Sequence, residues 1–118
     1  MFDVRKETEV LRGKVEKLLR RFGATQITVF HESDSGIILQ CIDRDGKKTF
    51  VKYEVRYYNN PIRRAEVADF AKYVQEKRRL GAEGGIYITN ATFEQGFDSQ
   101  IELVDGKQLD EMLSPQPR

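Results

Sequence analysis

The feature that most constrains the fold is a pair of β-type runs joined by a tight turn. Residues 36–42 (GIILQCI) and 48–58 (KTFVKYEVRYY) are dominated by β-branched, aromatic and other apolar residues. The sequence between them, DRDG, is typical of a hairpin turn. We therefore expect the two runs to pair as antiparallel neighbours in a sheet.

The second of these runs has an apolar face and a charged face. Successive side chains point to opposite sides of a strand, so Val51 and Tyr53 lie on one face while Lys52, Glu54 and Arg56 lie on the other. A strand with one charged face either meets solvent on that face or lines a cleft.

The remaining segments predict helices and further strands around the hairpin. Apolar residues recur at three- and four-residue spacing from Val4 to Phe22, which predicts an amphipathic helix that Gly23 ends. Pro61 is suited to the first turn of a second helix, which runs to Leu80. Further elements are expected as a strand at 26–30, a strand at 84–89, a polar turn and short helix at 91–97, a strand at 101–104 and a closing helix at 106–113.

The resulting order, α-β-β-β-α-β-α-β-α, defines the fold class. An antiparallel hairpin that leads into a helix and then a buried strand predicts an α/β fold, with a mixed β-sheet flanked by helices on both faces. A chain of 118 residues is long enough for one core. We expect a single domain over residues 1–113 and a flexible tail at 114–118.

The sequence shows no targeting or membrane-spanning segment. It has no long apolar run, and its first residues, MFDVRKETEV, are charged where a signal peptide would be apolar. We therefore expect a cytoplasmic protein. The single cysteine, Cys41, has apolar neighbours that predict a position in the core.

Charge is distributed unevenly along the chain. Lys and Arg prevail before residue 80, whereas Asp and Glu prevail after it. Such a division suits a protein with one face that meets a polyanion, although solvated helix surfaces produce it as well.

Three separated stretches carry motifs at consistent spacing. Residues 53–58 (YEVRYY) are followed by Pro61, by Ile62 six residues after Arg56, and by Phe70 eight residues further on. Residues 86–93 (IYITNATF) and 101–109 (IELVDGKQL) come later in the chain. Together they resemble the catalytic strand, the FITTSxF turn and the IxLIDGxxL element of the Mrr-type restriction endonuclease family in the PD-(D/E)-x-K nuclease superfamily.

This resemblance implies a restriction endonuclease-like core that binds double-stranded DNA, and it assigns active-site positions. The family holds Mg²⁺ with the carboxylate that closes a D-x-G-[IV]-D motif and with a second carboxylate two residues before a lysine. Here these positions are Ile38, Glu54 and Arg56, and a glutamate that many relatives carry on the first helix corresponds to Arg12. The resemblance therefore implies a degenerate active site with lost or much reduced cleavage.

DNA cleavage would be preserved if other residues had taken over as Mg²⁺ ligands. Asp34 precedes the second strand and is placed to approach Glu54, so these two carboxylates are candidate Mg²⁺ ligands, with Lys52 in place of the lost lysine. In the simpler interpretation, Asp34 serves a turn, and Glu54 pairs with Arg56 or Arg12 in a silent cleft. We favour the simpler interpretation, because without the strand aspartate the metal loses its main anchor.

A site of this kind retains positive charge. Arg12, Lys52 and Arg56 are candidates to bind phosphate directly. The residues expected to extend this nucleic-acid-binding surface are Lys47, Lys48, Tyr57, Arg63 and Arg64. For any one of them alone, an ordinary surface or strand position is the simpler interpretation. No base-reading motif stands out, so we expect binding that is independent of sequence and sensitive to salt.

Three functions remain open at this stage. The first is a DNA-binding protein of the Mrr-type family that cleaves little or not at all and needs no metal. The second is an active Mg²⁺-dependent DNA endonuclease that uses Asp34, Glu54 and Lys52. The third is a nuclease fold used for protein interaction or dimerisation, with the acidic C-terminal third as the contact. The resemblance makes a homodimer plausible in each case.

Overall fold

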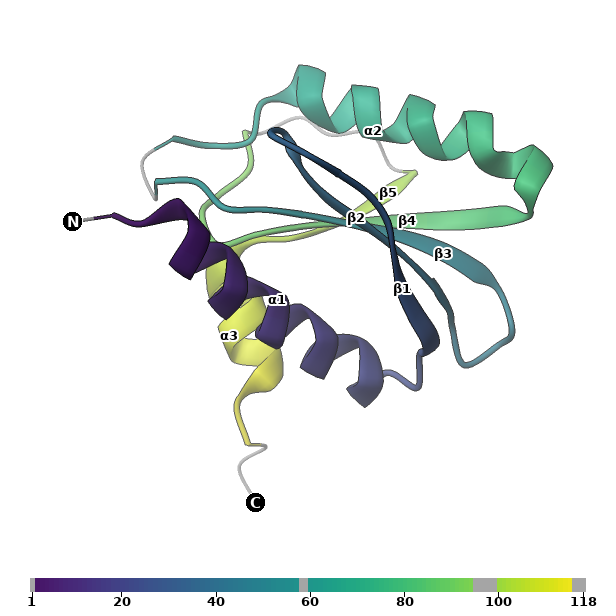
Figure 1. Ribbon diagram of the computed structural model, residues 1–118, viewed down its shortest axis with the longest axis horizontal. Coiled ribbons are helices and arrows are strands. Elements are labelled where there is room, and N and C mark those ends of the chain that lie inside the picture. The colour runs from purple at the N-terminus through teal and green to yellow at the C-terminus, as the bar shows by residue number, and fades with distance from the viewer. Residues whose placement is uncertain (1, 58–59, 95–99, 116–118) are drawn as a thin grey trace.

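A mixed sheet with helices on both faces forms the molecule (Figure 1). The computed structural model describes residues 2–57, 60–94 and 100–115. The elements within these residues are α1 (Val4–Arg21), β1 (Thr25–Ser33), β2 (Gly36–Ile42), β3 (Lys48–Glu54), α2 (Arg64–Glu76), the 3-10 helix η1 (Lys77–Leu80), β4 (Ala82–Thr89), β5 (Ile101–Val104) and α3 (Gly106–Leu113).

The sheet combines an antiparallel half with a parallel half. Its strands lie in the order β1-β2-β3-β4-β5; β2 is antiparallel to both β1 and β3, whereas β3, β4 and β5 run parallel. The predicted hairpin is confirmed, with Ile38 opposite Lys52. At its turn, the Asp43 carboxylate accepts hydrogen bonds from the backbone N–H groups of Asp45 and Lys47 at 2.9 Å each.

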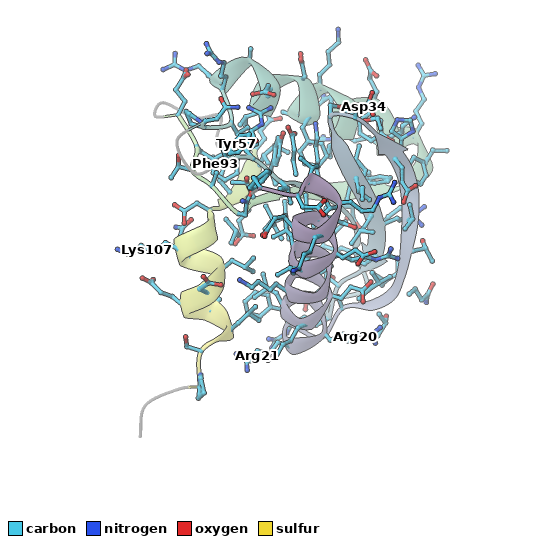
Figure 2. The ribbon with its side chains drawn as sticks, turned by 60° about the vertical axis from the view of Figure 1, so that its left-hand side comes forward. Arg20, Arg21, Asp34, Tyr57, Phe93 and Lys107 are labelled. Carbon is cyan, nitrogen blue, oxygen red and sulfur yellow. The ribbon has the colours of Figure 1, made fainter. Side chains whose placement is uncertain are left out.

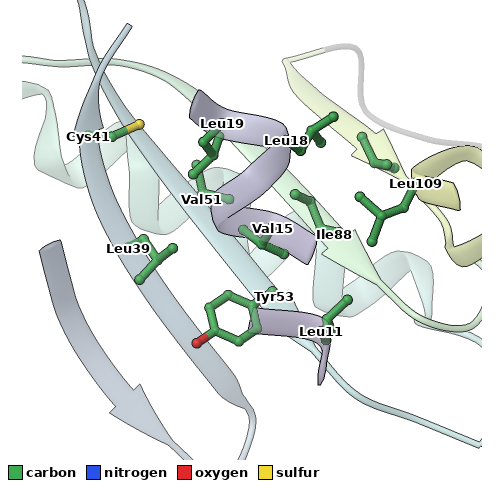
Figure 3. Close-up of a cluster of buried hydrophobic side chains, with 11 residues drawn as sticks. Leu11, Val15, Leu18, Leu19, Leu39, Cys41, Val51, Tyr53, Ile88 and Leu109 are labelled. Carbon is green, nitrogen blue, oxygen red and sulfur yellow. The ribbon is translucent and has the colours of Figure 1, made fainter. Parts of the chain in front are cut away.

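Each face of the sheet buries its own apolar cluster. Val51 and Tyr53 belong to the cluster under α1 and α3, while Phe50 belongs to the cluster under α2, so the predicted alternation along β3 is confirmed. Figure 3 shows the first cluster, in which Cys41 is buried as expected and burial raises the pKa of its thiol. Its buried members are Leu11, Val15, Leu18, Leu19, Leu39, Cys41, Val51, Tyr53, Ile88, Val104 and Leu109.

The second helix starts later than the sequence predicts. Ile62 forms an isolated bridge with Phe93: its N–H donates to the carbonyl of Thr92, and its own carbonyl accepts from the N–H of Glu94, both at 2.9 Å. This pairing keeps the chain extended after Pro61, so α2 begins only at Arg64.

Two further expectations fall partly on positions that the structure does not describe. Residues 91–94 contain the bridge rather than helical turns, and residues 95–97 of the expected short helix lie outside the described residues. The expected flexible tail likewise includes residues 116–118, which are not described. Among the described residues, no helix combines the length and the apolar character needed to cross a bilayer.

Two glycines allow close approach near the charged end of β3. Gly36 has a φ of 124°, and a Cβ there would lie 3.0 Å from the carbonyl oxygen of Tyr53. Gly106 starts α3 with its N–H on the carbonyl of Ala91 at 3.0 Å, and a Cβ there would collide with the backbone of Asn90. Both glycines therefore help to fix the surroundings of Glu54 and the residues that follow it.

Candidate functional site

The charged face of β3 meets the first turn of α2 where β3 and β4 end. Glu54 closes β3 and pairs in parallel register with Thr89 at the end of β4. Glu54 is only 9% exposed, although its side chain carries a carboxylate. A buried carboxylate is tolerated only with close hydrogen-bond partners, so its surroundings define the chemistry of the site.

Both carboxylate oxygens of Glu54 are occupied by neighbouring side chains. The Tyr87 hydroxyl donates to Oε1 at 2.8 Å, and Nε of Arg56 donates to Oε2 at 2.8 Å. Burial and the charge of Glu54 raise the pKa of Tyr87, so the phenol stays protonated and acts as a donor. Glu54 is therefore held as an internal acceptor on both sides.

The Arg56 guanidinium is surrounded by oxygen atoms of the protein. Besides its bonds to Glu54, Nη1 donates to the carbonyl of Pro61 at 3.1 Å, and Nη2 donates to Oε1 of Glu66. The Arg56 side chain is 15% exposed. The guanidinium thus bridges two carboxylates, and a phosphate that approached it would have to displace one of them.

The Asn90 side chain fixes the backbone of Arg56 with the pair of hydrogen bonds that a neighbouring strand would otherwise make. Asn90 accepts from the Arg56 N–H and donates to the Arg56 carbonyl, each at 2.7 Å. Thr89 adds a bond from its hydroxyl to the carbonyl of Glu54 at 2.9 Å. Strand β3 ends at Glu54 rather than at residue 58, and these two side chains replace the ladder bonds that would otherwise continue.

Glu66 connects the bridge to the start of α2. Its Oε2 accepts from the backbone N–H of Arg63 at 2.8 Å, one of the N–H groups that a helix start leaves without a partner. Burial opposes ionisation of Glu66, but the bonds from Arg56 and Arg63 outweigh it and hold the pKa of Glu66 below its ordinary value. The carboxylate is therefore charged near neutral pH.

Lys52 occupies the adjoining part of the cleft. Its Nζ lies 5.0 Å from the centre of the Tyr87 ring, a distance suited to a cation–π interaction. Burial lowers the pKa of Lys52, and Glu54 and Glu66 oppose this. Lys52 also lines a pocket of about 190 Å³ with Ser33, Ser35, Asp69 and other residues of the β1–β2 hairpin and α2.

The structure brings together some of the predicted site residues on the α2 face. Lys52, Glu54 and Arg56 share this face, and Arg63 precedes the first turn of α2. Asp34 lies at the tip of the β1–β2 hairpin, where Figure 2 labels it. It lines a pocket of about 220 Å³ to which Glu54 also contributes.

Other predicted residues lie apart from this cleft. Arg12 is on α1, over the opposite face of the sheet, where it pairs with Glu16 at 3.3 Å. Lys47 and Lys48 stand at the beginning of β3, roughly 25 Å from Arg56 by the rise of an extended strand. The Lys48 ammonium donates to the carbonyl of Leu80 at 2.7 Å.

Two residues expected to contact DNA, Tyr57 and Arg64, lie at the surface. Tyr57 is 54% exposed, and its ring centre lies 4.2 Å from that of Phe2. Arg64, the first residue of α2, is also exposed. Figure 2 labels Tyr57 near Phe93, on the side where α2 begins.

Sequence reasoning missed three residues that complete the site. Glu66, Tyr87 and Asn90 come from α2, β4 and the turn after β4, at separations of 10 to 34 positions from their partners. Two signals pointed to them. Tyr87 lies on a strand that was expected to be buried, where its hydroxyl requires a partner. Glu66 follows Arg63 by three residues, the spacing of a residue that caps a helix start.

The donor set does not fit the Mg²⁺ of the nuclease superfamily. Ile38, at the position of the first carboxylate, is apolar and packs in the cluster under α2. Both oxygens of Glu54 already accept hydrogen bonds. Within the described ranges, no group of three His, Cys, Asp or Glu side chains is arranged to hold a metal ion. Mg²⁺ prefers several oxygen ligands in octahedral geometry, and this cleft supplies a guanidinium in their place.

Comparison with known proteins identifies the class. The family model named Mrr_cat and described as a restriction endonuclease matches residues 7–113. The chain therefore belongs to the Mrr-type restriction endonuclease family, and its fold is restriction endonuclease-like, as the sequence motifs predict. The chain accordingly has the fold of a nuclease family whose function concerns DNA.

The structure is similar to that of the DNA modification-dependent restriction endonuclease AspBHI. The two share 13% sequence identity with a TM-score of 0.57, so the likeness concerns the fold. The match covers 92% of this chain and 31% of AspBHI, so the chain spans less than a third of that protein. A search among curated proteins finds no match.

Proposed function

We propose that the chain binds double-stranded DNA through its phosphate backbone and cleaves it little or not at all. The observation that carries this proposal is the occupation of Glu54, whose two oxygens accept from Tyr87 and Arg56. A carboxylate held in this way is not available as a metal ligand unless the guanidinium leaves. The exposed cations Arg63 and Arg64 beside the cleft are proposed as DNA contacts, because lysine and arginine supply most of the affinity for phosphate.

The other predicted contacts take different places in this proposal. Lys52 lines a pocket of the cleft and Tyr57 is exposed, so both are proposed to touch DNA. Lys47 and Lys48 would meet a different part of the duplex, because they stand at the far end of β3. Arg12 would act only on DNA that reached the α1 face.

A second candidate, an active Mg²⁺-dependent endonuclease, has one observation in its favour. Asp34 and Glu54 line the same pocket, and Lys52, whose pKa is lowered by burial, stands on the strand face of Glu54. A metal there would require Glu54 to exchange Arg56 for the ion. This candidate keeps Asp34, Glu54 and Lys52 as its catalytic residues.

Supercoiled plasmid incubated with the protein and either Mg²⁺ or Mn²⁺ tests both candidates. We expect slower migration of the plasmid in a gel before protein is removed, and intact supercoiled plasmid after it is removed. Nicked plasmid that accumulates with wild-type protein but not with Glu54→Ala would establish the endonuclease. Unchanged migration at low salt would refute DNA binding.

A further inference from the structure

A second basic surface lies outside the cleft, along one flank of α2 and η1. The apolar residues of α2, namely Val67, Phe70, Ala71 and Val74, face the sheet. On either side of this buried stripe, the helix has a flank toward the β1–β2 hairpin and a flank toward β5. The two flanks differ in charge.

The hairpin flank carries acidic and aromatic side chains. Asp69 and Tyr73 line the pocket with His31 and Ser33 of β1. The Lys77 ammonium, which comes next on this side, lies 5.0 Å from the Tyr73 ring centre and 5.8 Å from that of Phe30. This flank is therefore committed to contacts within the protein.

The β5 flank carries cations and uncharged residues. Helical spacing of three and four residues places Arg64, Ala68, Lys72 and Gln75 in one line on α2, and all four are exposed. Arg79, also exposed, follows on the 3-10 helix η1. Arg78 lies on this side too, since it shares a shallow pocket with Gln75, Gly84 and Ile101. Carboxylates also stand close to this line: Asp69 and Glu76 flank Lys72 at helical spacing, and Glu83 of β4 lines the same pocket as Arg78. We call Arg64, Lys72, Arg78 and Arg79 the α2 basic flank.

The α2 basic flank differs in its partners from three of the cations of α1. On α1, Arg12 pairs with Glu16, Lys14 pairs with Asp110, and Arg21 donates to the carbonyl of Met112. No hydrogen bond or ion pair within the described residues involves the side chains of Lys72, Arg78 or Arg79. The charges of these three side chains are therefore available to an external anion.

The length of the flank suits a duplex. Fifteen residues separate Arg64 from Arg79, which corresponds to roughly 22 Å along a helix. Duplex DNA carries one phosphate charge per about 1.7 Å of its axis, and its major groove is about 12 Å wide. The two ends of the flank can therefore meet phosphates on opposite sides of one groove.

We propose that the α2 basic flank is a second contact surface for the backbone of double-stranded DNA, separate from the cleft at Glu54 and Arg56. The inference rests on the proposed DNA-binding function and specifies the surface that carries it. Phosphate contacts of this kind position a protein on DNA without reading its sequence. A duplex held along α2 would pass the cleft beside Arg63, at the start of the same helix.

Fluorescence anisotropy with a labelled 20-base-pair duplex, measured from 50 to 200 mM salt, tests this surface. The test variant combines Lys72→Gln, Arg78→Gln and Arg79→Gln. The control combines Lys6→Gln, Lys17→Gln and Arg20→Gln, exposed positions on α1 that remove the same charge. Circular dichroism and thermal unfolding check that all three proteins are folded.

The test variant should lose the part of the salt dependence that its three cations supply. Each lost phosphate contact lowers the slope of log affinity against log salt by about 0.9, so three contacts lower it by about 2.7. Over this fourfold salt range, the wild type should lose about 40-fold more affinity than the test variant. The control variant should keep a slope within about one unit of the wild type.

Each other result overturns the proposal in a recognisable way. The test variant could keep the wild-type salt slope while Arg63→Gln or Lys52→Gln lowers it. That result would leave DNA binding intact and refute the α2 basic flank as a DNA contact. Equal decreases of the salt slope in the test and control variants would mean that net charge, and not this surface, determines DNA affinity. No wild-type binding would refute the proposed function itself. Displacement of the duplex by polyglutamate at equal charge concentration would point to an acidic protein instead of DNA.

Discussion

The two faces of the sheet each bury a tyrosine, and the two phenols have opposite surroundings. Under α1, Tyr53 is 1% exposed, and its hydroxyl has no hydrogen-bond partner among the described residues (Figure 3). Under α2, Tyr87 is fully buried, and its hydroxyl donates to Glu54. The α1 face is thus a packing surface, whereas the α2 face holds a network of paired charges.

Removal of Arg56 should have the largest effect on stability. Arg56→Ala leaves Glu54 and Glu66 close together without their shared cation, and loss of one partner from a largely buried pair costs about 3 kcal/mol. Urea unfolding should show this loss. Arg12→Ala, which breaks an exposed pair on α1, is the matched control and should cost less than about 1 kcal/mol. Similar losses for the two variants would show that the network is not a buried structural unit.

Loss of the Tyr87 hydroxyl should have the next largest effect. Tyr87→Phe removes a hydrogen bond to a buried carboxylate, which is worth about 2 kcal/mol. The free energy of unfolding should fall by this amount, with little change in its dependence on urea. An unchanged free energy would mean that water satisfies Glu54 as well as the phenol does.

Removal of the Tyr53 hydroxyl, on the α1 face of the sheet, should not lower the free energy of unfolding. Tyr53→Phe relieves a buried hydroxyl that has no partner within the described residues, so stability should stay constant or rise by up to about 1 kcal/mol. The two tyrosine variants form a matched pair, measured in one urea series. A loss in Tyr53→Phe equal to that in Tyr87→Phe would remove the distinction between the faces.

The smallest expected effect is a dependence on pH at Glu66. Because burial is outweighed by the bonds from Arg56 and Arg63, the folded pKa of Glu66 lies below its unfolded value. A depressed carboxyl pKa contributes stability above the unfolded pKa, and this contribution is lost as pH falls through the folded pKa. Glu66→Gln should therefore destabilise the protein at pH 7, and the difference should shrink as pH falls below the unfolded pKa of Glu66 and vanish once the folded carboxyl is protonated. A difference that persisted at low pH would indicate altered packing.

The sequence predicted those elements whose signals are local. The bounds of β2, β5 and α3 match the expected ones, because alternating apolar residues and an Asp-Gly start mark them in a few positions. The pairing of Glu54 with Arg56 was also predictable, since two residues separate them on one strand face. The start of α2 was not, because the bridge between Ile62 and Phe93 depends on a segment 31 residues away.

The rest of the site could not be read from the sequence for a similar reason. Glu66 and Tyr87 reach Arg56 and Glu54 only when α2 and β4 have packed against β3. A family position alone placed Arg12 near the cleft, and the structure places it across the sheet, since the face that a helix presents depends on its packing. The short-range pattern thus identified the charged strand, and tertiary contacts determined that Glu54 and Arg56 on it are neutralised within the protein.

Calorimetric titration of Mn²⁺ into the wild-type protein and into Glu54→Ala shows whether Glu54 can act as a metal ligand. The Arg56 guanidinium occupies the carboxylates of this cleft, and Ile38 supplies no ligand. We therefore expect the same weak, nonsaturating heats for both proteins at millimolar metal. Saturable binding in the wild type that Glu54→Ala abolishes would contradict this expectation, because Glu54 would then be a metal ligand.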